Sequence, residues 1–387
     1  MSGTDKPVSA HEQMKKRIFF QNLDGIRFFC FLSVFLCHSF YTENPSIVGS
    51  GIYHFIKITL FGNGNIGVNA FFVLSGFLIT YLLIEEKKIN GQVSPPKFWI
   101  RRILRIWPLY YFCVLFGFVL FPFLKQMFGQ TANESANPIY YLTFLANFDI
   151  IHHGLPDSST LGLLWSIAIE EQFYFLWPIV IYSFPVNRLW IPFVTIILSS
   201  LIFRAFNPVP VVYEIHTLSA ISDMTIGAVA AWLIHTSSGF REFVKNLTKP
   251  NIAFIYFLFI VIYLFRLPLL KEIFAIRIFD RLIVSIVLVF ILLEQTYSEN
   301  SFFKLSNLKT ISGLGVITYG LYCFHFVGIL IALTITRLFG INNHLWQVLV
   351  LETILGLAIT IGISKLSYVY FEKYFLNLKE KFSFITK

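Results

Sequence analysis

Long apolar segments recur along the whole chain and are separated by short polar stretches. A membrane-spanning helix needs about 20 mostly apolar residues. Segments that approach this length lie at 23–42, 65–84, 102–124, 161–184, 189–206, 215–235, 251–267, 279–296, 311–337 and 345–371. The stretch 138–151 is apolar but shorter, and we interpret it as a re-entrant or interfacial piece. The pattern predicts an all-α, polytopic integral membrane protein with about ten transmembrane helices.

Composition supports lipid as the solvent. Of the 387 residues, 56% are hydrophobic and only 13% are charged, and the mean hydropathy is +0.70. A soluble domain could not bury that much apolar surface. The first twenty residues are polar and basic, so we expect no cleavable signal peptide. The cysteines share apolar surroundings and unrelated spacings, which predicts neither a disulfide framework nor a metal site: Cys30, Cys37, Cys113 and Cys323.

The basic residues are distributed unequally between the two sides of the predicted membrane. Twenty of the 30 Lys and Arg residues fall on the side of the N-terminus, eight on the other side, and Arg27 and Lys365 lie within spans. This follows the positive-inside rule with both termini cytoplasmic, and explains the net charge of +9 without a nucleic-acid partner. We predict a cytoplasmic arm at 1–18, a membrane domain at 19–376 and a basic cytoplasmic tail at 377–387.

The first span carries an arginine near its start and a histidine near its end. Arg27 and His38 are eleven residues apart, so they share one helix face about 16 Å apart along the axis. An ionisable residue at membrane depth costs about 2.5–3.5 kcal/mol on insertion scales. This cost favours a functional role. The alternative is an arginine that snorkels to the headgroups and a histidine satisfied by a neighbouring helix.

The next two spans add a small-residue pair and a basic cluster. Ser75-Gly76 in mid-span predicts close helix packing more than catalysis. Arg101, Arg102 and Arg105 cluster at one helix end on the predicted cytoplasmic face. Guanidinium groups bind phosphate oxygens through paired hydrogen bonds, so this cluster is a candidate phosphate site. The alternative is an ordinary positive-inside anchor.

The fourth span holds two adjacent carboxylates between apolar residues. Two ionised glutamates in lipid require partners, so we expect Glu170 or Glu171 to be paired with a cation or held protonated. Ser166, Glu170 and Tyr174 follow four-residue spacing and share a face, which points Glu170 inward with polar company. The ninth span contains a second histidine, His325, for which a structural or positioning role is favoured over proton transfer.

Five of these pieces occur in the order typical of one family, and the chain resembles the acyltransferase-3 family over about residues 19–376. The matching stretches are Leu23-Asp24-Gly25-Ile26-Arg27 with His38, Gly67-Val68-Asn69 to Leu78, Arg101 to Arg105, Trp165-Ser166 to Tyr174, and Tyr319-Gly320-Leu321-Tyr322 with His325. Two positions depart from the family pattern: Asn69 stands where aspartate is common, and Tyr374 where proline often follows the Glu-Lys pair.

The resemblance implies an acyl-CoA-dependent O-acyltransferase of a bacterial-type inner membrane that acts on a surface glycan or related acceptor. The donor would be acyl-CoA, most simply acetyl-CoA, bound by Arg102 and Arg105 with Arg101, and no metal is expected. His38 would be the general base, and Glu170 or Asp24 would orient it or balance Arg27. Glu171 belongs to the same candidate catalytic set. Candidate supporting residues are Ser75, Trp165, Ser166, Tyr174, Tyr319 and His325. The family's additional extracytoplasmic hydrolase-like domain is not expected here.

Two other functions compete with this hypothesis. One is a proton-coupled transporter or flippase for a glycan or lipid. No inverted repeat or pair of broken helices is visible in the sequence, and transport explains the arginine cluster poorly. The other is a membrane deacylase that uses the same centre with water. The consumption of acyl-CoA separates these hypotheses from acyl transfer.

Overall fold

The computed structural model describes residues 20–382, and side chains are described for all of these except 21, 267–272 and 380. This part of the chain is helical and contains no strand. The all-α prediction is therefore confirmed. The predicted arm at 1–18 lies outside the described residues, and the domain division at 376 stays a prediction.

The long helices correspond to the predicted spans. They are α2 (Gln21–His38), α5 (Ile66–Asn90), α6 (Pro95–Leu115), α11 (Leu164–Ser183), α12 (Trp190–Phe206), α14 (Thr217–Thr236), α16 (Lys249–Glu272), α17 (Phe274–Tyr297), α19 (Thr318–Leu338) and α20 (Glu352–Ser367). Helix α6 continues through the π-helical turn η2 (Phe116–Leu120) into α7 (Phe121–Met127), and α20 continues through η6 (Tyr368–Glu372) into α21 (Lys373–Glu380). The predicted span 311–337 is broken at Ile317 into α18 (Lys309–Val316) and α19.

Shorter helices lie between the long ones. Before α5 come α3 (Pro45–Val48), α4 (Gly51–His54) and the π-helix η1 (Phe55–Leu60). The apolar stretch 138–151 forms two short helices, α8 (Pro138–Leu142) and α9 (Ala146–His153). The remaining pieces are α10 (Ser159–Gly162), α13 (Pro210–Ile215), α15 (Ser238–Lys245), the 3-10 turns η3 (Val186–Arg188) and η4 (Leu305–Asn307), and η5 (Gln347–Leu351).

Seven stretches of the described chain are long and apolar enough to cross a membrane: Ile66–Asn90, Pro95–Met127, Val186–Phe206, Pro210–Thr236, Lys249–Arg266, Thr318–Leu338 and Gln347–Lys379. The multi-pass class is confirmed, whereas the count of ten is not. The three predicted spans outside this set are α2, α11 and α17. Each carries buried or half-buried charged side chains that lower its apolar character, such as Arg27, Glu170 and Arg281.

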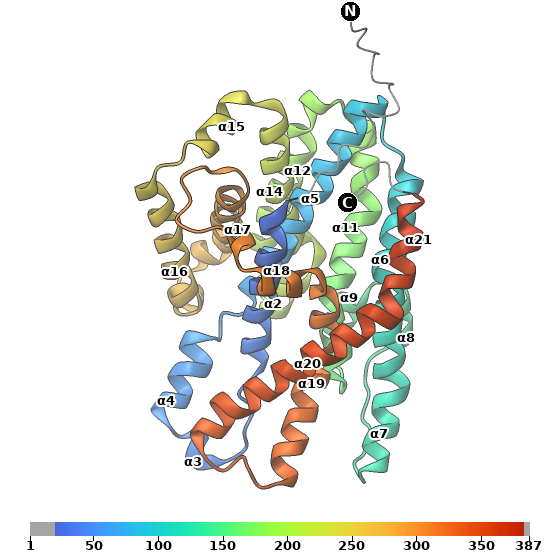
Figure 1. The fold of residues 1–387 in the computed structure, drawn as a ribbon, viewed down its shortest axis with the longest axis vertical. Coiled ribbons are helices and arrows are strands. Elements are labelled where there is room, and N and C mark those ends of the chain that lie inside the picture. Colours follow the sequence, from blue (N-terminus) through green and yellow to red (C-terminus); the bar gives the residue numbers. More distant parts are fainter. Residues whose placement is uncertain (1–19, 383–387) are drawn as a thin grey trace, which may run out of the picture.

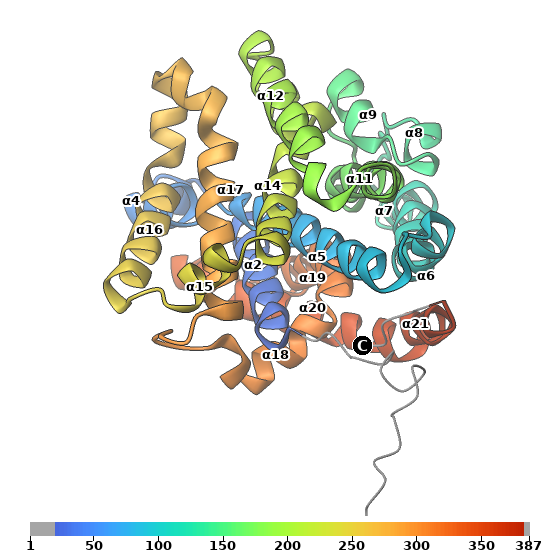
Figure 2. The same ribbon diagram turned by 90° about the horizontal axis from the view of Figure 1, so that it is seen from above.

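Helices α2, α5 and α14 occupy the middle of the molecule, with α16, α12 and α6 towards its edges (Figures 1 and 2). Helix α5 packs closely along α14 because glycines lie at their contact. A Cβ atom on Gly76 would come within 1.8 Å of the Met224 carbonyl oxygen, and one on Gly227 within 2.0 Å of that of Val73. The close approach predicted from Ser75-Gly76 is confirmed.

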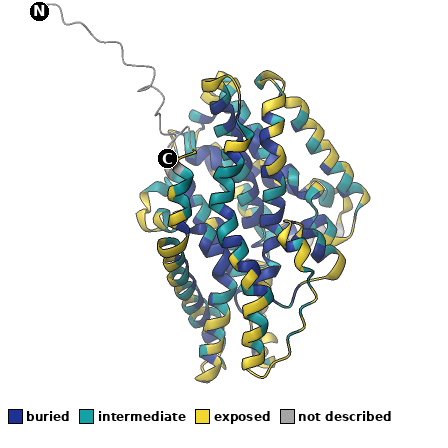
Figure 3. Cartoon of the chain, turned by 90° about the vertical axis from the view of Figure 1, so that its right-hand side faces the viewer, coloured by how far each residue is buried: buried dark blue, intermediate teal, exposed yellow. Residues whose placement is uncertain are grey.

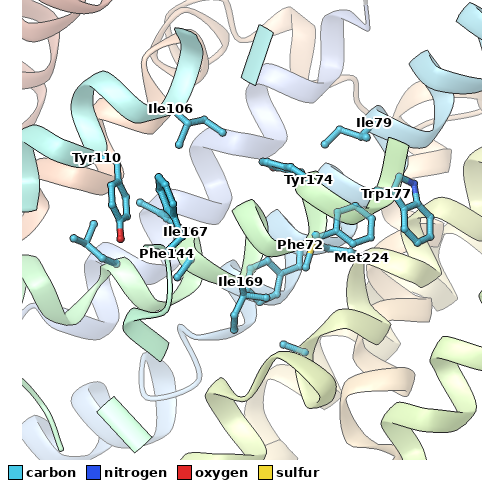
Figure 4. Packing of buried hydrophobic residues seen from close by; sticks show 14 of the residues in the cluster. Phe72, Ile79, Ile106, Tyr110, Phe144, Ile167, Ile169, Tyr174, Trp177 and Met224 are labelled. Carbon is cyan, nitrogen blue, oxygen red and sulfur yellow. The ribbon is translucent and has the colours of Figure 1, made fainter. Parts of the chain in front are cut away.

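The largest hydrophobic cluster lies where α5, α6, α11 and α14 meet. Figure 4 shows Phe72, Tyr110, Tyr174 and Trp177 among its members. Figure 3 shows buried residues in the interior of the bundle and exposed residues on its outer parts. Many of the exposed residues are large and apolar, among them Phe123, Phe175 and Phe254. Apolar side chains on the outer faces fit a protein whose solvent is lipid.

Candidate active site

The two intramembrane histidines meet. His38, the last residue of α2, places its Nδ1 atom 3.0 Å from Nε2 of His325 on α19. The two rings are stacked, with centroids 5.1 Å apart and planes 14° from parallel. Phe326 lies 4.6 Å from the His38 ring and 4.4 Å from the His325 ring, measured between centroids. His325 is fully buried, and His38 is half-buried.

The hydrogen bonds of this pair assign its tautomers. His325 Nδ1 lies 2.5 Å from the carbonyl oxygen of Tyr322, which can only accept, so this nitrogen carries the hydrogen. In neutral His325 the Nε2 atom is then an acceptor, and His38 Nδ1 must be the donor. His38 is left with an unprotonated Nε2, to which no residue within 20–382 is hydrogen-bonded. A neutral imidazole with a free lone pair has the properties of a general base.

Arg27 is paired locally. Its guanidinium donates to the carboxylate of Asp24, three residues earlier on α2, and only 15% of the Arg27 side chain is exposed. Arg27 also lies within electrostatic range of Arg105 and Tyr174. Among the described residues, no carboxylate contacts His38. Asp24 is thus the ion-pair partner of Arg27, and the polar side chain that contacts His38 is that of His325.

The polar residues of α11 each contact a different helix. Glu170 accepts hydrogen bonds from Ser75 of α5, at 2.9 Å, and from Tyr174, at 2.8 Å. The Tyr174 hydroxyl oxygen also lies 3.0 Å from Ser75 Oγ. The predicted inward face of Glu170 and Tyr174 thus has polar company from α5. Glu171 accepts from the indole of Trp107 on α6 at 2.8 Å.

The next residue of α11, Gln172, was not singled out from the sequence. Its amide donates to the Phe144 carbonyl at 2.8 Å and to the side chain of Asn147 at 3.0 Å, and it accepts from Thr217. Gln172 therefore connects α11 to α9, to the residues just before α9, and to α14.

One further contact joins α11 to the histidines. Ser166 Oγ lies 2.7 Å from the Tyr322 hydroxyl, and the Tyr322 backbone carbonyl is the acceptor of His325. Tyr322 lies on the same helix as His325, three residues earlier. Of the other candidate supporting residues, Tyr319 donates to the Ile106 carbonyl at 2.9 Å and Trp165 packs against Phe72. The structure thus brings Ser166, Tyr322, His325 and His38 into one connected set.

The three arginines of α6 have different surroundings. Arg101 forms an ion pair with Glu86 at 3.0 Å and donates to the Phe382 carbonyl. Arg102 lies over the rings of Phe98 and Tyr174, 5.4 and 5.3 Å from their centroids. Neither Arg102 nor Arg105 forms an ion pair or hydrogen bond with another residue of 20–382, and both lie within electrostatic range of Glu170. Arg101 therefore links α6 to the end of α5 through its ion pair with Glu86. Arg102 and Arg105 have no such partner among the described residues and could contact an anionic ligand.

A second buried polar cluster lies between α5, α14, α16 and α17. Arg281 pairs with Asp223 at 2.6 Å, Asn69 donates to the same carboxylate at 2.8 Å, and Arg266 pairs with Asp280 at 2.7 Å. Arg266 and Arg281 are two of the eight basic residues that the sequence assigns to the side opposite the N-terminus, and the structure buries both. The signal that could have found the cluster is the presence of both signs of charge inside neighbouring spans. Within the described residues, no group of His, Cys, Asp or Glu side chains could hold a metal ion.

Comparisons with known proteins agree with these features. The family model of the acyltransferase domain, Acyl_transf_3, matches residues 20–369. O-acetyltransferase OatA of Staphylococcus aureus is 33% identical over 174 residues, which are 44% of this chain and 26% of that protein. Peptidoglycan O-acetyltransferase OatA of Listeria monocytogenes is 35% identical over 121 residues, 30% of this chain and 19% of that protein. The chain thus covers about a quarter or less of these relatives' lengths. No solved structure matches.

Proposed function

This chain belongs to the acyltransferase-3 family, and from that premise we propose that it transfers an acyl group from cytoplasmic acyl-CoA to a hydroxyl of an extracytoplasmic glycan. The names of the relatives favour acetyl as the group and peptidoglycan as the glycan class. We further propose the bacterial cell membrane as its location, with ten spans and both termini cytoplasmic. In that arrangement the α6 arginines lie at the cytoplasmic face and His38 lies towards the opposite side.

The observation that carries this proposal is the free Nε2 of His38. In the proposed reaction this nitrogen takes the proton of the acceptor hydroxyl while the oxygen attacks the thioester carbonyl carbon. The new ester C–O bond forms, the C–S bond breaks, and the proton passes from His38 to the departing CoA thiolate. His325 holds His38 in the tautomer that this step needs. Arg102 and Arg105 would bind CoA phosphates, because they lack a protein anion as a partner.

The test uses the purified protein in liposomes with radiolabelled acetyl-CoA and soluble peptidoglycan fragments. We expect labelled glycan and an equal amount of free CoA. His38→Ala should lower the rate by about 10²–10⁴, the usual contribution of a general base. His152→Ala is the matched control, because this histidine is exposed on α9. A His38→Ala protein that is folded and fully active would overturn the assignment.

The same assay separates the two competing functions. A deacylase would remove acetyl groups from pre-acetylated glycan without consuming acetyl-CoA. A transporter would move the glycan across the bilayer with no release of CoA thiol. Acceptor-dependent release of CoA is expected only for the transferase.

A further inference from the structure

The chain leaves α2 through a backbone conformation that is unfavourable for its residue. Two residues after His38, Phe40 has φ = 65°, in the left-handed region. Side chains with a Cβ atom disfavour this region, and a bulky phenylalanine is uncommon there. Such conformations persist where the surrounding structure holds them, and they concentrate at functional sites.

Two side chains hold the Phe40 backbone. The Tyr53 hydroxyl donates to the Phe40 carbonyl oxygen at 2.8 Å, and Lys57 Nζ donates to the same oxygen at 3.2 Å. Lys57 also donates to the Tyr53 hydroxyl at 2.9 Å, so the three groups form a closed triangle. Tyr53 lies within α4, and Lys57 lies in the π-helix η1. Short π-helical turns are frequent at functional sites.

The Phe40 ring is fixed as well. It is buried in a small hydrophobic cluster with Ile47, Tyr53 and Val348, which joins the segment α3–α4 to η5 at the start of α20. Figure 1 shows α3 and α4 at the same end of the molecule as the connection between α19 and α20. The end of α2 is thereby attached to the helix pair that carries His325.

This attachment matters because His38 is the last residue of its helix. The terminal turn of a helix lacks intrahelical partners for its carbonyl groups and frays unless other groups hold it. Ser39 contributes a hydrogen bond from its hydroxyl to the Phe35 carbonyl at 2.8 Å, which lies within the same turn. Only Tyr53 and Lys57 connect the turn after His38 to another part of the described chain through hydrogen bonds to its backbone.

We propose that Tyr53 and Lys57 are positioning residues that hold His38 in register with His325 by fixing the left-handed Phe40 backbone. The inference rests on the proposed role of His38 as the base. A loss of orientation changes the chemical step and leaves the binding of the donor unchanged. A shift of about 1 Å at a reacting group can cost about 10²-fold in rate.

The first experiment measures steady-state kinetics of the full chain in liposomes. For Tyr53→Phe combined with Lys57→Gln we expect kcat to fall roughly 10- to 100-fold with an unchanged KM for acetyl-CoA. A matched pair of additional changes then tests the strain. In the Tyr53→Phe, Lys57→Gln background, Phe40→Gly and Phe40→Ala remove the same ring, but only glycine adopts the left-handed region freely. We expect a higher kcat per folded molecule for Phe40→Gly, and equal values would overturn the proposal.

A second readout does not depend on activity. Diethyl pyrocarbonate modifies accessible neutral imidazoles, and mass spectrometry gives the rate at each histidine. We expect faster modification of His38 in Tyr53→Phe, Lys57→Gln than in the unmodified protein, with the rate at exposed His152 unchanged. An unchanged modification rate at His38 would refute the positioning role of Tyr53 and Lys57. A fully active His38→Ala protein would refute the proposed base while leaving this labelling result unaffected, so the two failures are distinguishable.

Discussion

Nδ1 of His38 and Nε2 of His325 lie 3.0 Å apart although 287 positions separate the two residues in the chain. The contact joins the end of α2 to the interior of α19. Because the other nitrogen of His325 is committed to the Tyr322 carbonyl, the pair has a direction: His38 donates and keeps a free Nε2.

This direction makes His325 testable as a positioning residue. His325→Leu removes the acceptor of the His38 Nδ1 hydrogen, so both the tautomer and the ring orientation of His38 become undefined. We expect kcat to fall about 10²-fold or more, within the range of a general-base contribution, with an unchanged KM for acetyl-CoA. His325→Asn, which offers a carbonyl acceptor, should recover part of the loss. Equal rates for the leucine and asparagine variants would contradict a role through hydrogen bonding.

The two carboxylates of α11 are expected to differ in their response to neutralisation. Glu170 accepts from both Ser75 and Tyr174, and Glu171 accepts from Trp107 alone. Glu170→Gln replaces one acceptor oxygen by an NH2 group opposite hydroxyl donors, next to the helix turn that carries Ser166. We expect it to lower activity per folded molecule more than Glu171→Gln does.

The measurement is the initial rate of acyl transfer divided by the amount of monodisperse protein. Glu171→Gln should act mainly on the yield of folded protein, through the Trp107 contact. Full activity of Glu170→Gln beside a folded but inactive Glu171→Gln would reverse this assignment.

The α6 arginines give a third prediction. Arg105→Ala should raise the KM for acetyl-CoA, since Arg105 has no anionic partner within hydrogen-bond distance among the described residues. Arg105→Lys should restore it only in part, because lysine cannot bind phosphate through two parallel hydrogen bonds. Arg101→Ala is the internal comparison: its partner is Glu86, so we expect lower stability with little change in KM. If the KM for acetyl-CoA in all three variants equals that of the unmodified protein, the cluster is only a topological anchor.

The sequence predicted which helix faces are polar more reliably than which faces meet. Four-residue spacing placed Glu170 and Tyr174 together, and their hydrogen bond confirms this face. Spacing of eleven residues likewise placed Arg27 and His38 on one face of α2. Such local periodicity reports an orientation, because it follows from the geometry of a single helix.

Partners from distant helices lie beyond that information. The sequence around His325 predicts a structural or positioning role, and nothing in that span identifies His38 as its neighbour. The Asp223–Arg281 pair was missed for the same reason. The sequence assigns Arg281 to the extracytoplasmic side, although Asp223, the carboxylate with which it forms a buried ion pair, lies 58 positions earlier.

A pH-dependent prediction concerns the segment 130–158, which connects α7 to α10 and contains α8 and α9. Burial raises the pKa of Asp157, but the hydrogen bond and charge of Lys125 and the Asn133 amide outweigh this effect and lower the pKa below the ordinary 3.8. A depressed pKa gives stability that is present above pH 3.8 and is lost as the pH falls through the lowered value. The contribution is small, because the pair is partly exposed.

We therefore expect limited cleavage by pepsin within 130–158 to increase between pH 4.5 and pH 2.5 relative to cleavage elsewhere. Asp157→Asn serves as the control, since the carboxylate is then absent at both pH values and the relative increase should vanish. Persistence of the increase in Asp157→Asn would assign it to another group.

The last prediction compares a buried ion pair with an exposed one. Asp223 and Arg281 are both almost fully buried, and Asn69 donates to the Asp223 oxygen that Arg281 also contacts. Asp223→Asn leaves the Arg281 guanidinium buried without a full counter-charge, and breaking such a pair costs about 3–5 kcal/mol. The exposed pair of Lys245 and Glu299, with 44% and 64% of the side chains accessible, is the matched comparison. Glu299→Gln should change stability by at most about 1 kcal/mol. Unfolding of both variants in the same detergent, followed by the loss of monodisperse protein on heating, measures the difference. Similar midpoints for the two variants would show that Arg281 finds another partner when Asp223 is neutralised, and that the Asp223–Arg281 pair does not hold α14 to α17.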